Sequence, residues 1–192
     1  MTKLLFIGHG SFRLTANDGA VIYIDPFFEG DYSAMGDLIL ITHEHYDHNK
    51  TELVKLNSGG VIMRAKDFLP HYSPFAFGDI DVTAVSAYNK NHSKGCVGYV
   101  VSIDGKRLYF AGDTSKTDHM AKMKGIDYAF LPIDGVFNMD ATEATECAEL
   151  IGARFCVPVH TAPPEDEYNQ SAVNNFVPYN KRVVLPGREI TL

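Results

Sequence analysis

Four potential metal ligands lie within six consecutive positions of this 192-residue sequence: His43, His45, Asp47 and His48. His43 and His45 are two residues apart, so on extended backbone their side chains point to the same side and can share one metal ion. Asp47 and His48 lie just beyond them and can face a second ion. The pattern H-x-H-x-D-H has a chance expectation of about 0.001 in a chain of this length and composition, so it predicts a metal site.

Two further potential ligands follow predicted strands later in the sequence. Asp113 stands in the segment AGDT, where a small residue and a glycine allow the backbone to turn sharply. His160 stands in the segment VPVHT, at the end of another apolar run. Imidazole and carboxylate ligands without a thiolate suit zinc, iron, manganese or related ions.

The elements that must position these residues are predicted from apolar runs and turn signals. The continuous apolar run 38–42 predicts a strand buried on both faces, and the metal motif begins where this strand ends. Other strands are predicted at 3–7, 11–15, 20–25, 80–87, 96–103, 107–111, 128–131 and 155–159, with a closing strand pair at 183–185 and 189–192. Helices are predicted at 51–56, 116–124 and 140–151.

Local signals refine two of these elements. Asp140 stands at the N-cap of the last predicted helix, and Glu143 stands at the capping-box position. The dipeptide Asp104-Gly105 predicts a tight hairpin between two strands. Strands dominate early in the chain and strand–helix units appear later, which predicts an α/β fold of stacked sheets covered by helices. No repeat or linker divides the chain, so we expect a single domain over residues 1–192.

Composition excludes several classes of protein. The net charge of −7 argues against a nucleic-acid binder, which should carry a basic patch. The apolar runs are far shorter than the 18 or so residues of a membrane span, so no membrane partner is expected. Three cysteines without C-x-x-C spacing indicate buried, unpaired thiols and a reducing cytoplasm.

The ordered motifs THEHYDH, AGDT and PVH resemble those of the metallo-β-lactamase superfamily. The surrounding segments IDPFFEG, AYNKNHSKGCVGYVVSIDGKRLYFAGDTS and FLPIDGVFNMDATEA are similar to those of small metal-dependent hydrolases related to the ascorbate-6-phosphate lactonase group. The resemblance spans about Gly8 to His160. It implies a four-layer αβ/βα sandwich, with two mixed β-sheets flanked by helices and a two-metal site on the edge of the sheets.

The resemblance also implies a role for each ligand. His43, His45 and a third histidine would hold the first ion, and Asp113 would bridge both ions. The second ion would be held by Asp47, His48 and His160.

The third histidine of the first ion has three candidates, which are His71, His92 and His119. His92 is preferred because it follows the segment 87–89, which the related hydrolases share, and lies between the first motif and AGDT in family order. His71 sits in an irregular stretch and His119 in a predicted surface helix.

The expected chemistry is hydrolysis of a small ester, lactone or phosphoester. Two divalent ions, most simply zinc but also manganese, iron or nickel, lower the pKa of a bound water to about 7 and so make hydroxide available. Asp47 can orient this nucleophile and pass on its proton, and Asp113 holds both ions. The two ions give the pocket a positive local charge, so we expect a small-molecule substrate that can be anionic.

Several residues near the motifs are candidates for supporting roles. Asp25, in the segment IDP, can accept a hydrogen bond from a ligand histidine, or simply end its strand in a turn. His9 can line the pocket or serve a structural role in the first hairpin turn. Four further residues sit beside ligands and can contact substrate: Tyr46, Tyr88, Asn89 and Lys94.

Three other functions remain open at this point. One is a nuclease-like phosphodiesterase, against which the low basic charge counts. Another is an iron-containing redox protein that uses the same ligand set. The third is a metal-binding protein without activity, against which the complete ligand set counts. The oligomeric state is not predicted.

Overall fold

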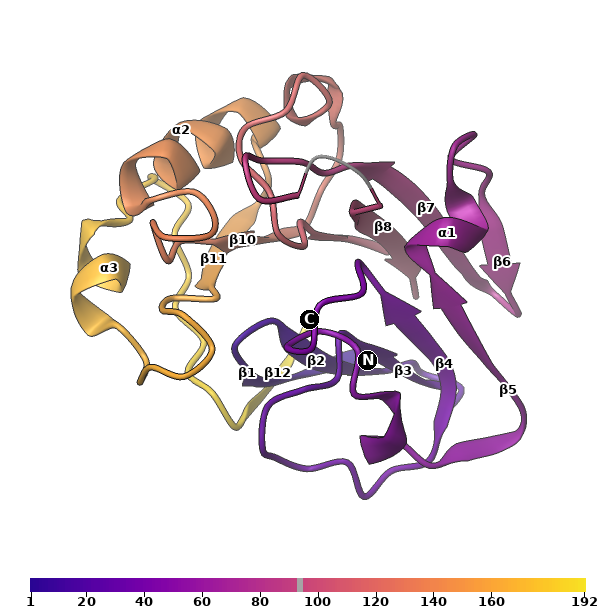
Figure 1. Cartoon of the computed structure of the whole chain (residues 1–192). Coiled ribbons are helices and arrows are strands. Elements are labelled where there is room, and N and C mark those ends of the chain that lie inside the picture. The colour runs from indigo at the N-terminus through magenta and orange to yellow at the C-terminus, as the bar shows by residue number, and fades with distance from the viewer. Residues whose placement is uncertain (93–94) are drawn as a thin grey trace.

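Two β-sheets face each other in the structure (Figure 1), each with six strands among the described residues. The computed structural model describes residues 1–92 and 95–192. The first sheet, in spatial order, consists of β12 (Arg188–Thr191), β1 (Lys3–Gly8), β2 (Ser11–Thr15), β3 (Val21–Ile24), β4 (Gly36–Ile41) and β5 (Leu56–Arg64). The second consists of β11 (Phe155–Val159), β10 (Tyr128–Pro132), β9 (Lys106–Phe110), β8 (Val97–Ile103), β7 (Ile80–Ser86) and β6 (Phe75–Phe77).

Both sheets are mixed, and both follow the same plan. In each sheet, antiparallel pairs on one side give way to two parallel pairs, which are β3–β4 and β4–β5 in the first and β9–β10 and β10–β11 in the second. Parallel strands bring their carboxyl ends to the same edge of a sheet, where loops can carry a site. The predicted α/β fold with two mixed sheets is confirmed.

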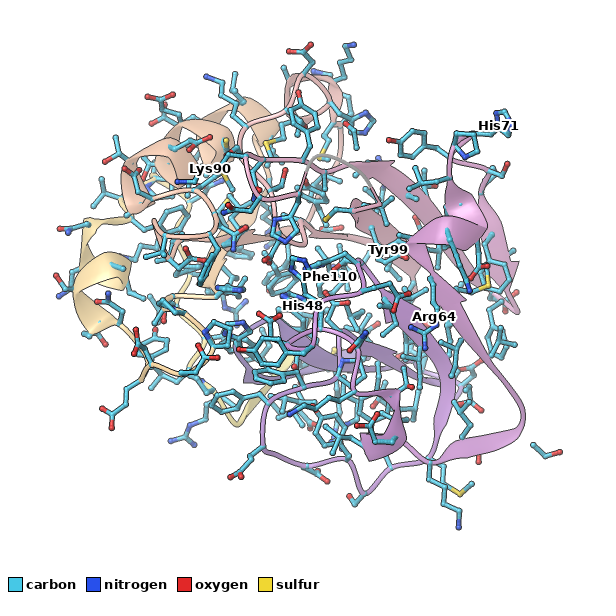
Figure 2. All side chains as sticks on the ribbon, in the orientation of Figure 1. His48, Arg64, His71, Lys90, Tyr99 and Phe110 are labelled. Atoms are coloured by element: carbon cyan, nitrogen blue, oxygen red, sulfur yellow. The ribbon has the colours of Figure 1, made fainter. Side chains whose placement is uncertain are left out.

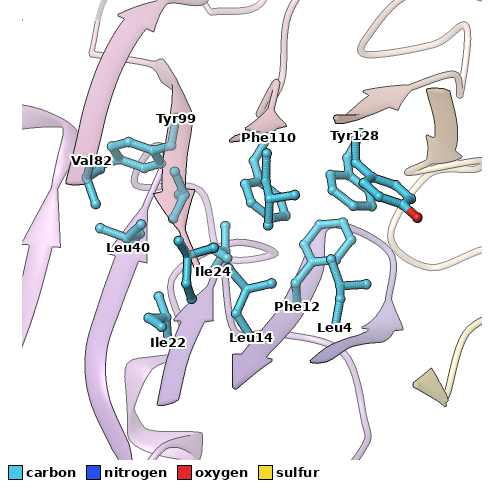
Figure 3. Packing of buried hydrophobic residues seen from close by; sticks show 14 of the residues in the cluster. Leu4, Phe12, Leu14, Ile22, Ile24, Leu40, Val82, Tyr99, Phe110 and Tyr128 are labelled. Carbon is cyan, nitrogen blue, oxygen red and sulfur yellow. The ribbon is translucent and has the colours of Figure 1, made fainter. Parts of the chain in front are cut away.

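The main hydrophobic core fills the space between the two sheets (Figure 3). Phe12 of β2 packs edge-on against Phe110 of β9, with ring centroids 5.0 Å apart. Tyr99 of β8 crosses the core, and its hydroxyl donates to the carbonyl of Ile41 at 2.8 Å. Since Ile41 is the last residue of β4, this bond fixes the end of that strand immediately before the metal motif.

Helices cover the outer face of the second sheet, where α2 (Ala141–Ile151) and α3 (Gln170–Asn175) pack. The predicted N-cap is confirmed, because the Asp140 carboxylate accepts from the backbone N–H of Thr142 and of Glu143. The outer face of the first sheet is packed by Tyr32 and Ala34 of the loop after β3 and by Val54.

The predicted helix at 116–124 is wrong. The structure has only a 3-10 turn there, η2 (Met120–Lys122). The segment is shorter than the roughly 12–15 residues that an isolated helix needs. Ser115 N–H donates to the carbonyl of Tyr88, and Lys116 N–H donates to the Glu143 carboxylate at 2.8 Å. Because the Glu143 carboxylate accepts this hydrogen bond from Lys116, it does not form the predicted capping box of the helix that follows Asp140.

Two further elements differ from their prediction. The helix predicted at 51–56 is only the 3-10 turn η1 (Thr51–Leu53), because Leu56 already belongs to β5 and pairs opposite Gly36 of β4. The closing strand pair does not form within the last residues. Instead, β12 pairs antiparallel with β1, while Val184 is buried in the main core. Pro186 has no N–H to contribute to a local hairpin.

Four elements were not predicted. These are β5, β6, α3 and the one-turn helix α1 (Ala65–Phe68). Gly59 and Gly60 lie in the middle of β5, and because glycine is disfavoured in strand interiors, the sequence pattern there does not indicate a strand.

The predicted hairpin at Asp104-Gly105 is confirmed between β8 and β9. Both of its residues have positive φ, 50° and 74°, as a tight turn of this type requires. No helix in residues 1–92 and 95–192 has the length and apolar character needed to cross a membrane.

Candidate metal centre

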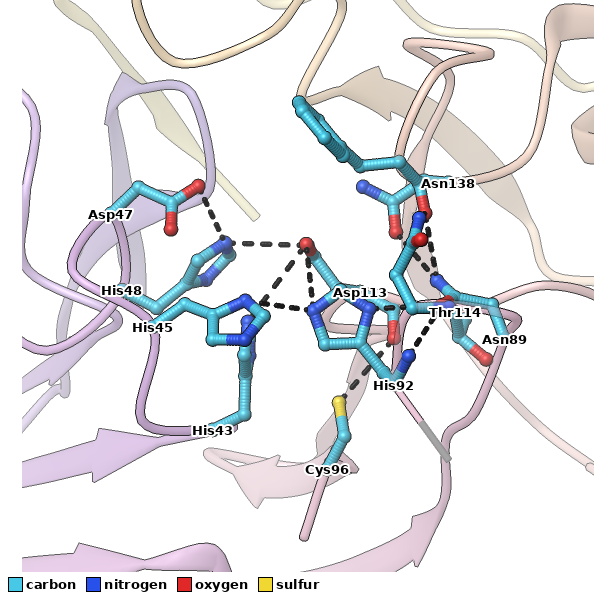
Figure 4. Close-up of polar contacts among 12 residues, drawn as sticks. His43, His45, Asp47, His48, Asn89, His92, Cys96, Asp113, Thr114 and Asn138 are labelled. Carbon is cyan, nitrogen blue, oxygen red and sulfur yellow. Dashed lines mark hydrogen bonds and ion pairs between the residues drawn. The ribbon is translucent and has the colours of Figure 1, made fainter. Parts of the chain in front are cut away.

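The predicted ligands converge where strands of both sheets end, and Figure 4 shows all of them except His160. His43 and its neighbours follow β4 of the first sheet, whereas His92, Asp113 and His160 follow β7, β9 and β11 of the second. Their potential ligand atoms form three overlapping groups, and within each group these atoms lie within 4.8 Å of one another. The centre therefore joins the two sheets at one edge.

The first group contains His43, His45 and His92. Nδ1 of His45 lies 2.9 Å from Nε2 of His92, and the ring centroids of His43 and His45 are 4.8 Å apart. His43 and His92 are buried, whereas His45 is exposed. The third histidine predicted from the family order thus lies beside the other two.

The second group contains Asp47, His48 and His160, together with His9. Oδ2 of Asp47 lies 3.7 Å from Nε2 of both His48 and His160, and 3.2 Å from Nε2 of His9. His9 packs its ring on that of His160, with centroids 3.6 Å apart, and its carbonyl accepts from His160 N–H. His9 therefore contacts the centre directly from the first hairpin turn.

Asp113 stands between the two groups. Its Oδ1 lies 3.2 Å from Nε2 of His48 and 3.6 Å from Nε2 of His160. Its Oδ2 lies 3.6 Å from Nε2 of His92 and 3.8 Å from Nε2 of His43. One oxygen thus faces each group, which is the placement that a ligand shared by two ions requires.

Four buried polar atoms at the centre make no hydrogen bond to any described residue: Nε2 of His43, His48 and His160, and Oδ1 of Asp113. A buried polar group without a partner is costly, so such atoms are expected to have a partner of some kind. Because these four atoms are all metal-ligating types and are shared among the three groups, cations held by these groups would give each of them a partner. The donor set therefore fits the metal that the motif predicts.

Charge at the centre is arranged around the Asp113 carboxylate. Burial lowers the pKa of His43 to about 2, so this ring stays neutral with a lone pair available. Burial would also lower the pKa of His160, but Asp113 and neighbouring carboxylates raise it to about 9. Burial opposes ionisation of Asp113 itself, yet His48 and His160 hold its pKa well below the usual range. Protonated histidines thus balance the carboxylate in the metal-free chain, a role that cations take over.

Two carboxylates contact the far side of the second group. Asp25 accepts from Nδ1 of His48 at 2.8 Å and from both the N–H and hydroxyl of Thr42, so it lies behind a predicted ligand histidine, and its supporting role stays a prediction. Asp134 lies with its Oδ2 2.9 Å from Nδ1 of His160, an ion pair rather than a well-aligned hydrogen bond. Asp134 was not predicted. Its signal was available, because it follows the strand end in LPID just as Asp113 follows β9.

Neutral oxygens contact the far side of the first group. Oδ1 of Asn89 accepts from Nδ1 of His92 at 2.9 Å, and it also accepts from the backbone N–H of Asn91 and His92. Oγ1 of Thr42 lies 3.0 Å from Nδ1 of His43. Asn89, predicted as a substrate candidate, therefore holds a histidine in place.

The remaining candidates lie at or beyond the edge of the centre. Tyr88 contributes backbone contacts to Thr114 and exposes its ring. His71 is exposed at the periphery beside α1, far out from the more central His48 (Figure 2). His119 precedes η2 and belongs to none of the three groups. Lys94 lies outside the described residues.

An open pocket of about 510 Å³ leads to the centre. His45, Asp47, His92 and Asp113 lie at its base. Its walls include the exposed rings of Tyr46 and Phe137 and the side chain of Glu165, to which the Tyr46 hydroxyl donates a hydrogen bond. This volume is within the range of about 300–1,000 Å³ that is typical of small-molecule sites.

Comparison with known proteins identifies the class of this fold and site. Residues 3–160 match the family described as the beta-lactamase superfamily domain, so the chain belongs to that family. It is a metal-dependent hydrolase with the metallo-β-lactamase fold. The narrower resemblance to the ascorbate-6-phosphate lactonase group stays a prediction.

The alignments with individual relatives cover most of this chain. A UPF0173 metal-dependent hydrolase from Geobacillus thermodenitrificans is 31% identical over an alignment of 226 residues, which covers 99% of this chain and 100% of the relative. Among solved structures, a protein from Parabacteroides distasonis has a TM-score of 0.77 and 28% identity, covering 94% of this chain and 91% of its own. A metallo hydrolase from Ignicoccus hospitalis has a TM-score of 0.73 and 25% identity, covering 99% and 98%.

Proposed function

We propose that this protein hydrolyses a small ester, lactone or phosphoester at a centre of two divalent ions. The observation that carries the proposal is the position of Asp113, whose two oxygens face two separate groups of ligands. His43, His45 and His92 would hold one ion. The other would be held by Asp47, His48 and His160, and Asp113 would bridge both.

Held by these residues, the ions would supply Lewis acidity, which would polarise the substrate oxygen and make hydroxide available near neutral pH. Zinc is the simplest choice, and manganese, iron and nickel suit the same imidazole and carboxylate ligands. The chain's own residues position the reactants. The four potential ligands at the base of the pocket keep the reacting end of the substrate over the centre.

Asp47 has a further role in orienting the nucleophile. Burial raises its pKa, but the contacts from His160 and His9 outweigh burial, so the carboxyl group stays ionised. Its Oδ2 faces His9, His48 and His160, while the residue also lines the pocket. An ionised carboxylate at this point can accept a hydrogen bond from the attacking water and hold the proton of the reaction near the leaving group.

The substrate is proposed to be a small molecule. A pocket of about 510 Å³ with aromatic walls at Tyr46 and Phe137 admits one small organic group at a time. The net charge of −7 disfavours a polyanionic partner such as nucleic acid, whereas the ions at the base still attract a small anionic group. Three buried cysteines without disulfides suit a reducing cytoplasm.

Metal analysis of protein purified without added metal, followed by a panel of chromogenic lactones, phosphodiesters and esters, tests the proposal. The expected result is two ions per chain and turnover of one substrate class that a chelator abolishes. Iron with a visible absorption band and oxygen consumption, without hydrolysis, would overturn it. Full activity after complete removal of metal would overturn it as well.

A further inference from the structure

The two proposed ion positions are supported by unlike partners. In the group of His48 and His160, each ring nitrogen that points away from the centre meets a buried carboxylate, at 2.8 Å for Asp25 and 2.9 Å for Asp134. In the group of His43 and His92, the corresponding nitrogens meet neutral oxygens.

This difference has a known consequence for metal binding. A carboxylate on the far nitrogen of an imidazole fixes the ring and makes it a more basic ligand, and loss of such a partner reduces metal affinity by about 10- to 100-fold. A neutral oxygen orients the ring but adds no negative charge. The exposed His45 adds to the contrast, because water competes with the ion more easily there.

The surrounding fold holds the Asp134 side chain in place behind His160. The residue follows the end of β10, and its side chain is fully buried, at 0% exposed. Its Oδ1 accepts from the backbone N–H of Val136, Phe137 and Asn138, and its Oδ2 accepts from the side chain of Asn138. The carboxylate is thus fixed by its own loop, and it is not free to turn away from His160.

We propose that the centre binds its two ions unequally and that Asp134, together with Asp25, is the cause. The position of Asp47, His48 and His160 fills first and holds its ion at least about tenfold more tightly than the position of His43, His45 and His92. Asp134 is a positioning residue, since it acts through His160. This inference rests on the proposed two-ion function.

Titration of the metal-free full-length protein with Co²⁺ tests the order of filling. Co²⁺ is suitable because its visible absorption changes with its ligands, and calorimetry gives the affinity of each class. Two classes separated by about tenfold or more are expected. His45→Ala, at an exposed ligand, should remove the weaker class and leave the tighter one.

Two near-isosteric variants then act in opposite directions. Asp134→Asn should weaken the tighter class about 10- to 100-fold and leave the weaker class unchanged. Asn89→Asp places a carboxylate behind His92 and should strengthen the weaker class. Asp81→Asn, an exposed carboxylate of β7, is the matched control and should change neither class.

The outcomes separate this inference from the proposed function. Two ions bound with equal affinity in the unmodified protein would overturn the inference and leave the two-ion function standing. A single ion per chain would overturn the two-ion function. If Asp134→Asn is not folded by circular dichroism, the Asn89→Asp variant decides, because an unchanged weaker class in that protein also overturns the inference.

Discussion

The half of the centre formed by Asp47, His48 and His160 lies deeper in the fold than the half formed by His43, His45 and His92. His48 and His160 are 1% and 2% exposed and do not line the open pocket, whereas His45 is exposed and lines it together with His92. The two halves meet at the pocket through Asp47, which also lines it, while His43 is buried. We call the group of Asp47, His48 and His160 the deep half and the group of His43, His45 and His92 the shallow half. The deep half is supported by carboxylates and the shallow half by neutral oxygens. The comparison leads us to expect that the deep half contributes mainly to metal binding and the shallow half mainly to substrate binding.

Loss of the residue that joins the two halves should have the largest effect. Asp113→Ala removes one oxygen from each group, so we expect both ions to be lost or displaced. The activity should fall by more than the about 100-fold that loss of an outer partner costs. Elemental analysis and a hydrolysis assay measure this. Asp118→Ala, an exposed aspartate outside the three groups, is the control. Full metal content and activity in Asp113→Ala would show that the halves do not share this carboxylate.

Replacing one histidine from each half should change the free energy of unfolding by different amounts, even when no metal is bound. In the metal-free protein, His48→Ala leaves the buried Asp25 without its ion-pair partner, and breaking such a pair costs about 3–5 kcal/mol. His45→Ala removes an exposed side chain and should change the free energy of unfolding by less than about 0.5 kcal/mol. Urea denaturation in the presence of a chelator measures both. Equal losses would contradict the difference in depth between the halves.

Metal removal should lower the thermal stability, and the two halves should contribute unequally to this loss. Free metal at about 100 times its dissociation constant stabilises a protein by about 2.7 kcal/mol, so chelation should lower Tm by about 5–10 °C in a chain of this size. If the deep half fills first, the first equivalent of metal should restore most of this difference. Thermal denaturation at zero, one and two equivalents measures the increments, and a larger increment from the second equivalent would contradict the order.

Much of the centre could be predicted because its residues follow strand ends. The runs before His43, Asp113 and His160 are continuous and apolar, so both the strands and the points where they end are visible in the sequence. The structure brings these residues together with His45, Asp47, His48 and His92, although their roles as ligands stay a prediction.

The parts that could not be predicted depend on distant partners. Asp134 follows a strand end, which the sequence shows, but its contact with His160 depends on the pairing of β10 with β11, which no local pattern encodes. The segment expected to be a helix at 116–124 forms only the turn η2, and the backbone N–H groups of Ser115 and Lys116 at its start donate to Tyr88 and Glu143 from distant parts of the chain. The pairing of β12 with β1 joins the two ends of the chain, and no local pattern encodes it.

The smallest predicted effect concerns the wall above the shallow half. Tyr46→Phe removes the hydroxyl that donates to Glu165 across the pocket, and that bond raises the pKa of Tyr46 to about 12. A single hydrogen bond contributes about 0.5–1.5 kcal/mol, and solvent exposure places this one at the lower end. We therefore expect KM to rise about two- to fivefold with kcat unchanged, because the wall holds substrate but does not take part in the reaction. Steady-state kinetics measures this, with Tyr88→Phe as the control at another exposed tyrosine. A tenfold fall in kcat would place the Tyr46 hydroxyl among the reacting groups and extend the substrate-binding role of the shallow half into the chemical step.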